Sequence, residues 1–184
     1  MTTLEQLQQT AGKLYQIVNT EFASLDLSLL NFKPAPDSWS ILECLEHLNR
    51  YSRYYNPALA KAIAANSDGN DMQSITYSWL GKKSLDMVRP QNTKKHKTVK
   101  HMNPNNSTLD RKTIQEFLQH QTELINLLGS AKSANLNKKA VPVEFFKLLK
   151  MRIGEALEFV VLHQERHLQQ ALRVKQQVAQ QAAA

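Results

Sequence analysis

The chain has 184 residues, of which 42% are hydrophobic and 21% charged, and its formal net charge is +7. This length and balance are typical of one globular domain, so we expect residues 1–184 to form a single domain with a sizeable core. No apolar run approaches the ~20 residues that span a bilayer, and the start lacks the layout of a secretory signal. The single cysteine, Cys44, excludes an intrachain disulfide. We therefore expect a cytoplasmic protein with no membrane partner.

Much of the positive charge lies in segment 82–101, in which Asp86 is the one acidic residue. Charge runs are usually hydrated surface, so a solvated basic loop is the simpler interpretation. The more specific interpretation is that these basic residues form a rim that attracts anions beside a binding site. A basic chain can also bind nucleic acid, but no helix-turn-helix, RNA-binding sheet or zinc finger is present. Nucleic acid is thus the least favoured partner.

The first predicted helix has an apolar face with steps of three and four residues. This face consists of Leu4, Leu7, Ala11, Leu14, Val18, Phe22 and Leu25. Thr3 and Gln6 have the spacing of a capping box, in which two side chains satisfy backbone N–H groups at a helix start. Pro34 and Pro36 then prevent a regular helix and predict an extended turn.

A second helix is predicted from Ser40 to about Ala65, because Ser40 and Glu43 again form a capping box. Its apolar face consists of Leu45, Leu48, Ser52, Tyr55 and Leu59. Residues 67–106 then form a long connection, with a short helix expected around residues 77–88.

A third helix is predicted to start at Ser107, with Asp110 three residues later, and to end at Gly129. Its inner face consists of Ile114, Phe117, Gln121, Leu124 and Leu128. The last helix is predicted to begin between Pro142 and Phe145 and to fray after about residue 177. Its inner face consists of Leu149, Ile153, Ala156, Val160, His163, His167, Gln170 and Val174. No segment shows convincing β alternation, so the expected fold is all-α, a four-helix bundle with a long crossover between helices two and three.

His163 and His167 continue the inner face of the last helix, where aliphatic side chains are expected. A buried polar group without a partner costs roughly 1–3 kcal/mol, so two stacked imidazoles need something to bind. Histidines at i and i+4 share one helix face and can both reach one metal ion. The spacing alone is weak evidence, since most such pairs are incidental. A metalloprotease motif is excluded, because Glu165 points away from the face that the two histidines share.

A third ligand would strengthen the metal hypothesis, and four histidines remain. His96 and His101 lie in the basic connection, where exposure is the default, and His120 lies beside the main apolar face of the third helix. His47 lies early in the second helix, on the flank that carries Cys44. Periodicity alone does not select His47 with any force.

Residues 30–50, which contain His47, and residues 148–170, which contain His163 and His167, resemble segments of proteins of the DinB/YfiT-like superfamily. "LNFKPAPDSWSILECLEHLNR" (residues 30–50) resembles the region in which a Pro-x-x-x-Trp-Ser segment opens a helix that carries a histidine. "LLKMRIGEALEFVVLHQERHLQQ" (residues 148–170) resembles the last helix, an apolar stretch that ends in two histidines one turn apart followed by Leu-x-Gln. The order, the spacing and the long middle connection also match, so the resemblance covers nearly the whole chain.

This resemblance implies an up-down-down-up four-helix bundle, often a homodimer, with three histidines that hold a divalent metal such as Zn, Ni, Mn or Fe. Transferred position by position, the ligands are His47, His163 and His167, with no departure from the family pattern. The family includes transferases and isomerases that use bacillithiol, mycothiol or glutathione, and members without known activity. The resemblance therefore implies a small-molecule substrate and a low-molecular-weight thiol.

Three imidazoles leave at least one coordination position open on a zinc-like ion. An open position can bind a thiol as thiolate, which favours an S-transferase, or water, which favours a metal-dependent hydrolase. A non-catalytic bundle with a structural or ligand-binding metal site is a further alternative. The basic rim would consist of Lys94, Lys95, Lys97 and Lys100 if the connection covers the site.

Other polar and aromatic residues receive simpler interpretations. Trp39 is expected to anchor the core where the second helix starts, and Tyr51 and Tyr55 to pack, with a hydroxyl as a possible donor. Cys44 is expected to be a buried, inert thiol. Glu155 and Glu158 are candidates to orient a ligating imidazole.

Overall fold

The structure, a computed structural model, describes residues 3–67, 74–92, 94 and 97–182. Within these ranges the protein is mostly helical, with one small antiparallel pair of strands. The α-helices are α1 (Leu4–Glu21), α2 (Leu27–Leu30), α3 (Ile41–Ala64), α4 (Trp79–Val88), α5 (Lys112–Ser130) and α6 (Ile153–Ala182). The strands are β1 (Lys139–Val143) and β2 (Phe146–Arg152), and two short 3₁₀ helices are η1 (Lys100–Met102) and η2 (Ala131–Ser133).

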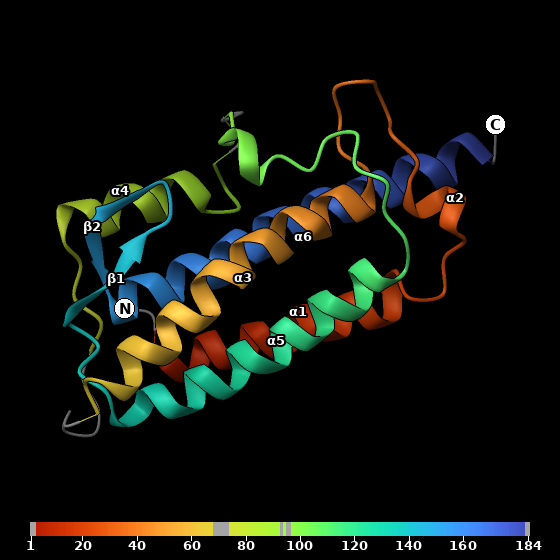
Figure 1. The fold of residues 1–184 in the computed structure, drawn as a ribbon. Helices are drawn as coiled ribbons and strands as arrows, with labels where there is room; N and C mark the ends of the chain where they lie inside the picture. The colour runs from red at the N-terminus through yellow and green to blue at the C-terminus, as the bar shows by residue number, and fades with distance from the viewer. Residues whose placement is uncertain (1–2, 68–73, 93, 95–96, 183–184) are drawn as a thin grey trace.

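The four long helices α1, α3, α5 and α6 lie side by side (Figure 1). α3 packs against α5 and α6, and α1 packs against the same two helices. α1 and α6 run in one direction along the molecule, whereas α3 and α5 run in the other (Figure 1). Each long helix therefore has two long neighbours, and the faces between them are buried.

Both predicted capping boxes are present. In α1, the Thr3 hydroxyl accepts a hydrogen bond from the Gln6 backbone N–H at 3.2 Å, and the Gln6 side chain accepts one from the Thr3 N–H at 3.0 Å. Ser40 and Glu43 make the same reciprocal pair in α3, at 3.1 and 2.9 Å. The second box fixes the start of α3 and hence the position of His47, about two helical turns further along.

The predicted start of the third helix at Ser107 is wrong, because α5 begins at Lys112. Asn106 has a left-handed backbone conformation, with φ at 63°, so the chain turns just before the predicted cap residue, Ser107. The Ser107 hydroxyl accepts a hydrogen bond from the Arg50 guanidinium at 3.3 Å. The predicted end at Gly129 is also not observed, since α5 includes Gly129 and ends at Ser130, and no described glycine has a positive φ.

The predicted start of the last helix, between Pro142 and Phe145, is also wrong. Residues 139–152 form an antiparallel hairpin of β1 and β2, in which Val141 pairs with Met151. α6 begins only at Ile153. The expectation of a purely α-helical chain therefore fails in this one segment.

The hairpin was missed because its apolar residues also fit helical spacing. Phe146, Leu149 and Ile153 follow steps of three and four, and periodicity cannot separate a short strand from one or two helical turns. Burial decides between them: Leu149, assigned to the inner face of a helix, is 41% exposed. Along β1 the β-branched residues Val141 and Val143 alternate inward, as strand residues do.

The long connection between α3 and α5 contains the predicted short helix, α4, which packs against α6. Its N-cap residue is Ser78, whose hydroxyl accepts a hydrogen bond from the Gly81 N–H at 3.0 Å. In the part of the chain that the structure describes, no helix has the length and apolar character needed to cross a bilayer.

Candidate metal centre

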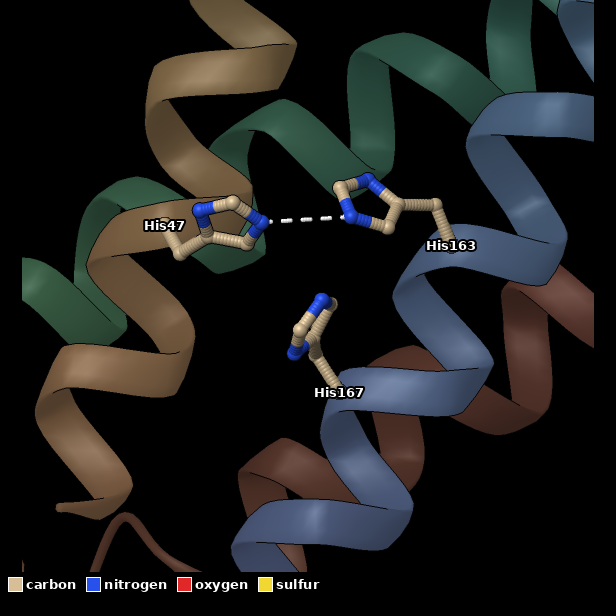
Figure 2. Close-up of side chains that lie close together, drawn as sticks. All are labelled: His47, His163 and His167. Atoms are coloured by element: carbon tan, nitrogen blue, oxygen red, sulfur yellow. Dashed lines mark hydrogen bonds between the residues drawn. The ribbon is translucent and has the colours of Figure 1, made fainter. Parts of the chain in front are cut away.

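Three histidine side chains from two helices point toward one another in the space between α3 and α6 (Figure 2). His47 comes from the first half of α3, whereas His163 and His167 lie one turn apart on α6 and leave the same face of that helix. The structure thus brings together the three residues that the sequence nominated as metal ligands.

The facing ring nitrogens are close enough to share one ion. The Nε2 atoms of His47 and His163 are 3.2 Å apart, and one nitrogen from each of the three histidines lies within 4.8 Å of the others. Two nitrogens bound to one zinc ion at about 2.0–2.1 Å in tetrahedral geometry are about 3.4 Å apart. The described residues contain no second cluster of three or more His, Cys, Asp or Glu with this geometry.

The hydrogen-bond partners of the outer nitrogens determine which nitrogens face inward with a lone pair. His47 Nδ1 donates to the Met102 carbonyl at 2.8 Å, and His167 Nδ1 donates to Gln170 Oε1 at 3.0 Å. A carbonyl oxygen can only accept, so both Nδ1 atoms carry the proton and both Nε2 atoms keep a lone pair. This outer hydrogen bond is the usual support of a metal-bound imidazole.

Burial keeps the cluster uncharged. It lowers the pKa of His47 to about 4, despite the opposing hydrogen bond to Met102. Burial also holds the pKa of His163 and of His167 well below the ordinary histidine value, and the neighbouring imidazoles add to this effect. The neutral form is the one that binds a cation. The donor set and its protonation state therefore both fit a divalent metal.

Two aromatic rings form walls of the site. The Trp39 ring centroid is 4.8 Å from that of His47 and 5.5 Å from that of His167, and Tyr51 lies 4.9 Å from His47 and 4.4 Å from His163. Trp39 does pack against the core, as predicted, but its contact with two of the histidines was not foreseen. Both rings restrict how the imidazoles can turn.

The connection between α4 and α5 is fastened on both sides of the cluster. On α6, the Arg166 guanidinium donates to the backbone carbonyls of Arg89, Asn92 and Lys94. On α3, His47 bonds the Met102 carbonyl, and the Arg50 guanidinium donates to the carbonyls of His101 and Asn103. The segment that the sequence placed conditionally over the site is thus attached to both helices that carry the histidines.

Three lysines of the predicted rim, Lys94, Lys97 and Lys100, are exposed. The fourth, Lys95, lies outside the described residues, as does His96. Exposure fits both interpretations of this segment, a solvated loop and an anion-attracting rim.

The other described histidines lie elsewhere, as the sequence suggested. His101 is 62% exposed and its Nε2 lies 2.5 Å from Glu144. His120 lies at the edge of α5, where its two ring nitrogens face Glu116 and Glu123 at 3.3 and 3.1 Å.

The remaining candidates have structural roles. Cys44 is fully buried, and burial raises the pKa of its thiol, which matches the expected inert residue. Tyr55 is buried in the core.

Glu155 accepts hydrogen bonds from the backbone N–H groups of Ser78 and Arg152, and so ties the start of α4 to the start of α6. Glu158 accepts a hydrogen bond from the Tyr77 hydroxyl at 2.7 Å. The outer partners of the histidines are Met102 and Gln170, which the sequence did not indicate.

Two buried glutamines interrupt the apolar core. The burial of Gln121 was predicted, because it lies on the predicted inner face of the third helix, whereas the burial of Gln164 was not predicted. The apolar core consists of two clusters along the helices, and Gln121 of α5 and Gln164 of α6 lie between them in sequence. Both are almost fully buried. Gln121 donates to the Ala11 carbonyl at 3.0 Å, whereas both side-chain polar atoms of Gln164 lack a hydrogen-bond partner among the described residues. The spacing of Gln164 from the buried residues Val160 and Leu168 was the available signal.

These observations define a helical protein in which three neutral imidazoles from two helices converge. Sequence comparison shows the family to which the chain belongs. The chain belongs to the DinB superfamily, whose family model matches residues 6–171. It is also similar to an uncharacterised protein of Bacillus subtilis (strain 168), YuaE, with 23% identity over 159 residues, which cover 86% of this chain and 90% of the relative. No solved structure matches the chain. The family assignment made from the two histidine-bearing segments is thus confirmed.

Proposed function

We propose that His47, His163 and His167 hold one divalent cation and that the protein is a metal-dependent enzyme of the thiol S-transferase type. In this proposal the four long helices form an up-down-down-up four-helix bundle that carries the site between α3 and α6. The observation that supports it most directly is the convergence of the three rings, two of which turn an Nε2 lone pair inward.

Three imidazole ligands occupy three positions around a zinc-like ion and leave at least one open. When bound, such a cation would supply Lewis acidity at that position, which favours the deprotonated form of a thiol or of water. The chain's own contribution is to hold three neutral donors in place and to exclude competing protons, since burial lowers the pKa of all three histidines.

Nearby residues provide the means to bind and orient a small molecule. Burial raises the pKa of Tyr51, so its hydroxyl stays protonated at neutral pH and can donate a hydrogen bond. The Trp39 ring offers an apolar surface beside two of the histidines. The exposed Lys94, Lys97 and Lys100 on the overlying connection would attract a carboxylate, as carried by many low-molecular-weight thiols.

The test combines elemental analysis with turnover. We expect purified protein to carry about one divalent ion per chain, and His163→Ala to lose it. The matched control is His120→Ala, which removes a histidine outside the cluster and should retain the ion. Each protein, loaded separately with Zn²⁺, Ni²⁺ or Mn²⁺, is then assayed with low-molecular-weight thiols and electrophiles. Turnover should be lost in His163→Ala and retained in the wild type and in His120→Ala.

Each alternative has its own outcome. Turnover that needs water but no thiol would replace the transferase with a hydrolase. Bound metal without turnover across the panel would leave a non-catalytic metal site. If the protein retains no ion after exposure to any of these metals, the metal proposal itself fails.

A further inference from the structure

Most of the large apolar side chains that are exposed to solvent lie at one end of the part of the chain that the structure describes. Among the described residues seven large hydrophobic side chains are exposed, and six of them lie on α4 and the β1–β2 hairpin: Trp79, Met87, Phe145, Phe146, Leu148 and Leu149. Trp79 is 74% exposed and Leu148 is 84% exposed. α4 contacts β2, and both lie at the end where α6 begins (Figure 1). We call these six residues, together with the exposed lysines of α4, β1 and β2, the α4–hairpin surface.

α4 is amphipathic, and its apolar side chains are not confined to its buried face. Gly81, Leu85 and Val88 are buried, whereas Trp79, Lys83 and Met87 follow one another at four-residue steps along the exposed face. The Lys83 ammonium lies over the Trp79 ring, 5.0 Å from its centroid. A tryptophan on the outer face of a helix, beside a lysine, is typical of elements that lie in a membrane interface.

The hairpin repeats this arrangement on a strand. In β2, Phe146, Leu148 and Lys150 alternate with Lys147 and Leu149, and all five are exposed. β1 by contrast buries its two valines. β2 therefore presents phenylalanine and leucine to solvent with lysines on either side, which an ordinary solvated strand would not do.

Basic residues outnumber acidic ones on this surface. Five exposed lysines lie on α4 and the two strands: Lys82, Lys83, Lys139, Lys147 and Lys150. The acidic residues of α4 and of segment 139–152 are Asp86 and Glu144. Asp86 lies 3.6 Å from the Arg89 guanidinium, and Glu144 lies 2.5 Å from the His101 ring. Exposed apolar side chains interspersed with lysines are complementary to a surface that is apolar beneath and negatively charged at its rim.

We propose that the α4–hairpin surface docks on anionic lipid, with the aromatic and leucine side chains at the acyl boundary and the lysines among the headgroups. A second copy of the chain fits less well, because a two-fold interface would place this lysine-rich surface against itself. The proposal is independent of the metal site. It departs from the expectation of no membrane partner, which rested on the lack of a spanning segment, and a peripheral contact needs none.

Vesicle co-sedimentation tests the proposal with the full chain at low ionic strength. The probes are vesicles of phosphatidylcholine alone and of phosphatidylcholine mixed with phosphatidylglycerol. We expect binding to the anionic vesicles only, weakening as salt rises. The double variant Phe145→Ser/Leu148→Ser should weaken binding by about tenfold or more, and Lys147→Gln by about fivefold.

Matched controls come from the rest of the chain. Leu27→Ser removes the seventh exposed hydrophobic residue, on α2 at the opposite end, and Lys13→Gln removes an exposed lysine of α1. Both should bind like the wild type. In a Trp39→Phe background, Trp79 is the remaining tryptophan, and its emission should shift to shorter wavelength on binding.

Three results would overturn the proposal. The first is no binding to anionic vesicles at low salt. The second is binding that the α4–hairpin variants leave unchanged while Leu27→Ser or Lys13→Gln weakens it. The third is a concentration-dependent dimer that Phe145→Ser/Leu148→Ser disrupts while lipid binding is absent, which would assign the surface to a second copy.

Discussion

The histidine cluster and the α4–hairpin surface reverse the usual placement of side chains in opposite ways. Between α3 and α6, two imidazole rings are buried and a third is half-buried where aliphatic residues would pack best. At the end where α6 begins, phenylalanine, tryptophan and leucine side chains face solvent. Isolated exceptions of either kind are common in folded proteins. We infer that something outside the chain completes each cluster, and we propose a cation for the first and a lipid surface for the second.

The effect of metal on stability should differ most between variants of the two regions. With zinc at about a thousand times its dissociation constant, binding stabilises the folded chain by about 4 kcal/mol. We expect a large upward shift of the thermal midpoint relative to protein in chelator, measured by circular dichroism. His163→Ala should lose this shift, whereas Phe145→Ser/Leu148→Ser should keep it in full. An equal zinc-dependent shift in His163→Ala would remove the link between the cluster and metal.

Acid should destabilise the metal-free protein through the cluster. Burial lowers the folded-state pKa of His47 to about 4, below the ordinary histidine value of about 6.5. Between these values the unfolded chain binds more protons than the folded one, so stability falls as pH falls. For His47 alone the loss by pH 5 is about 2 kcal/mol.

Urea unfolding of metal-free protein at pH 7 and pH 5 measures this loss. His47→Gln should show a smaller difference between the two pH values, because it removes one titrating group. The α4–hairpin variant should behave like the wild type. A pH dependence that is the same in wild type and His47→Gln would show that His47 does not contribute.

Gln170 offers a finer test, because it accepts a hydrogen bond from His167 and is not itself a proposed ligand. Without the hydrogen bond from its Nδ1, the His167 ring loses the partner that fixes its tautomer. We expect Gln170→Ala to weaken metal binding by about tenfold, the lower end for outer partners of ligating histidines. Competition against a chelating dye measures the change. Gln169→Ala, one position earlier on α6, is the control, and an equal loss in both variants would contradict this role of Gln170.

Helix starts with strong local chemistry were predictable from the sequence. Thr3 with Gln6 and Ser40 with Glu43 satisfy their own backbone groups within four residues, so their capping boxes need no knowledge of the rest of the fold. The hairpin was not predictable in this way. Phe146, Leu149 and Ile153 fit a helix equally well, and packing outside the segment decides its conformation.

The same difference between local signals and distant packing applies to the residues of the site. His163 and His167 follow from periodicity, but His47 needed the family resemblance, since its distance from them is set by the packing of α3 on α6. Met102, which holds His47, was beyond prediction, because a backbone carbonyl carries no residue signature. The burial of Gln164 was predictable, because Gln164 lies four residues from each of the buried residues Val160 and Leu168, but the predicted inner face of the last helix did not include it.

A crystal of the native protein, with anomalous scattering collected at metal absorption edges, tests the central claim most directly. The account predicts one peak per chain between α3 and α6, with an Nε2 atom of each of His47, His163 and His167 at about 2.0–2.1 Å if the ion is zinc. No peak at the cluster in protein soaked with zinc, nickel and manganese, or a peak bound by other residues, would contradict it.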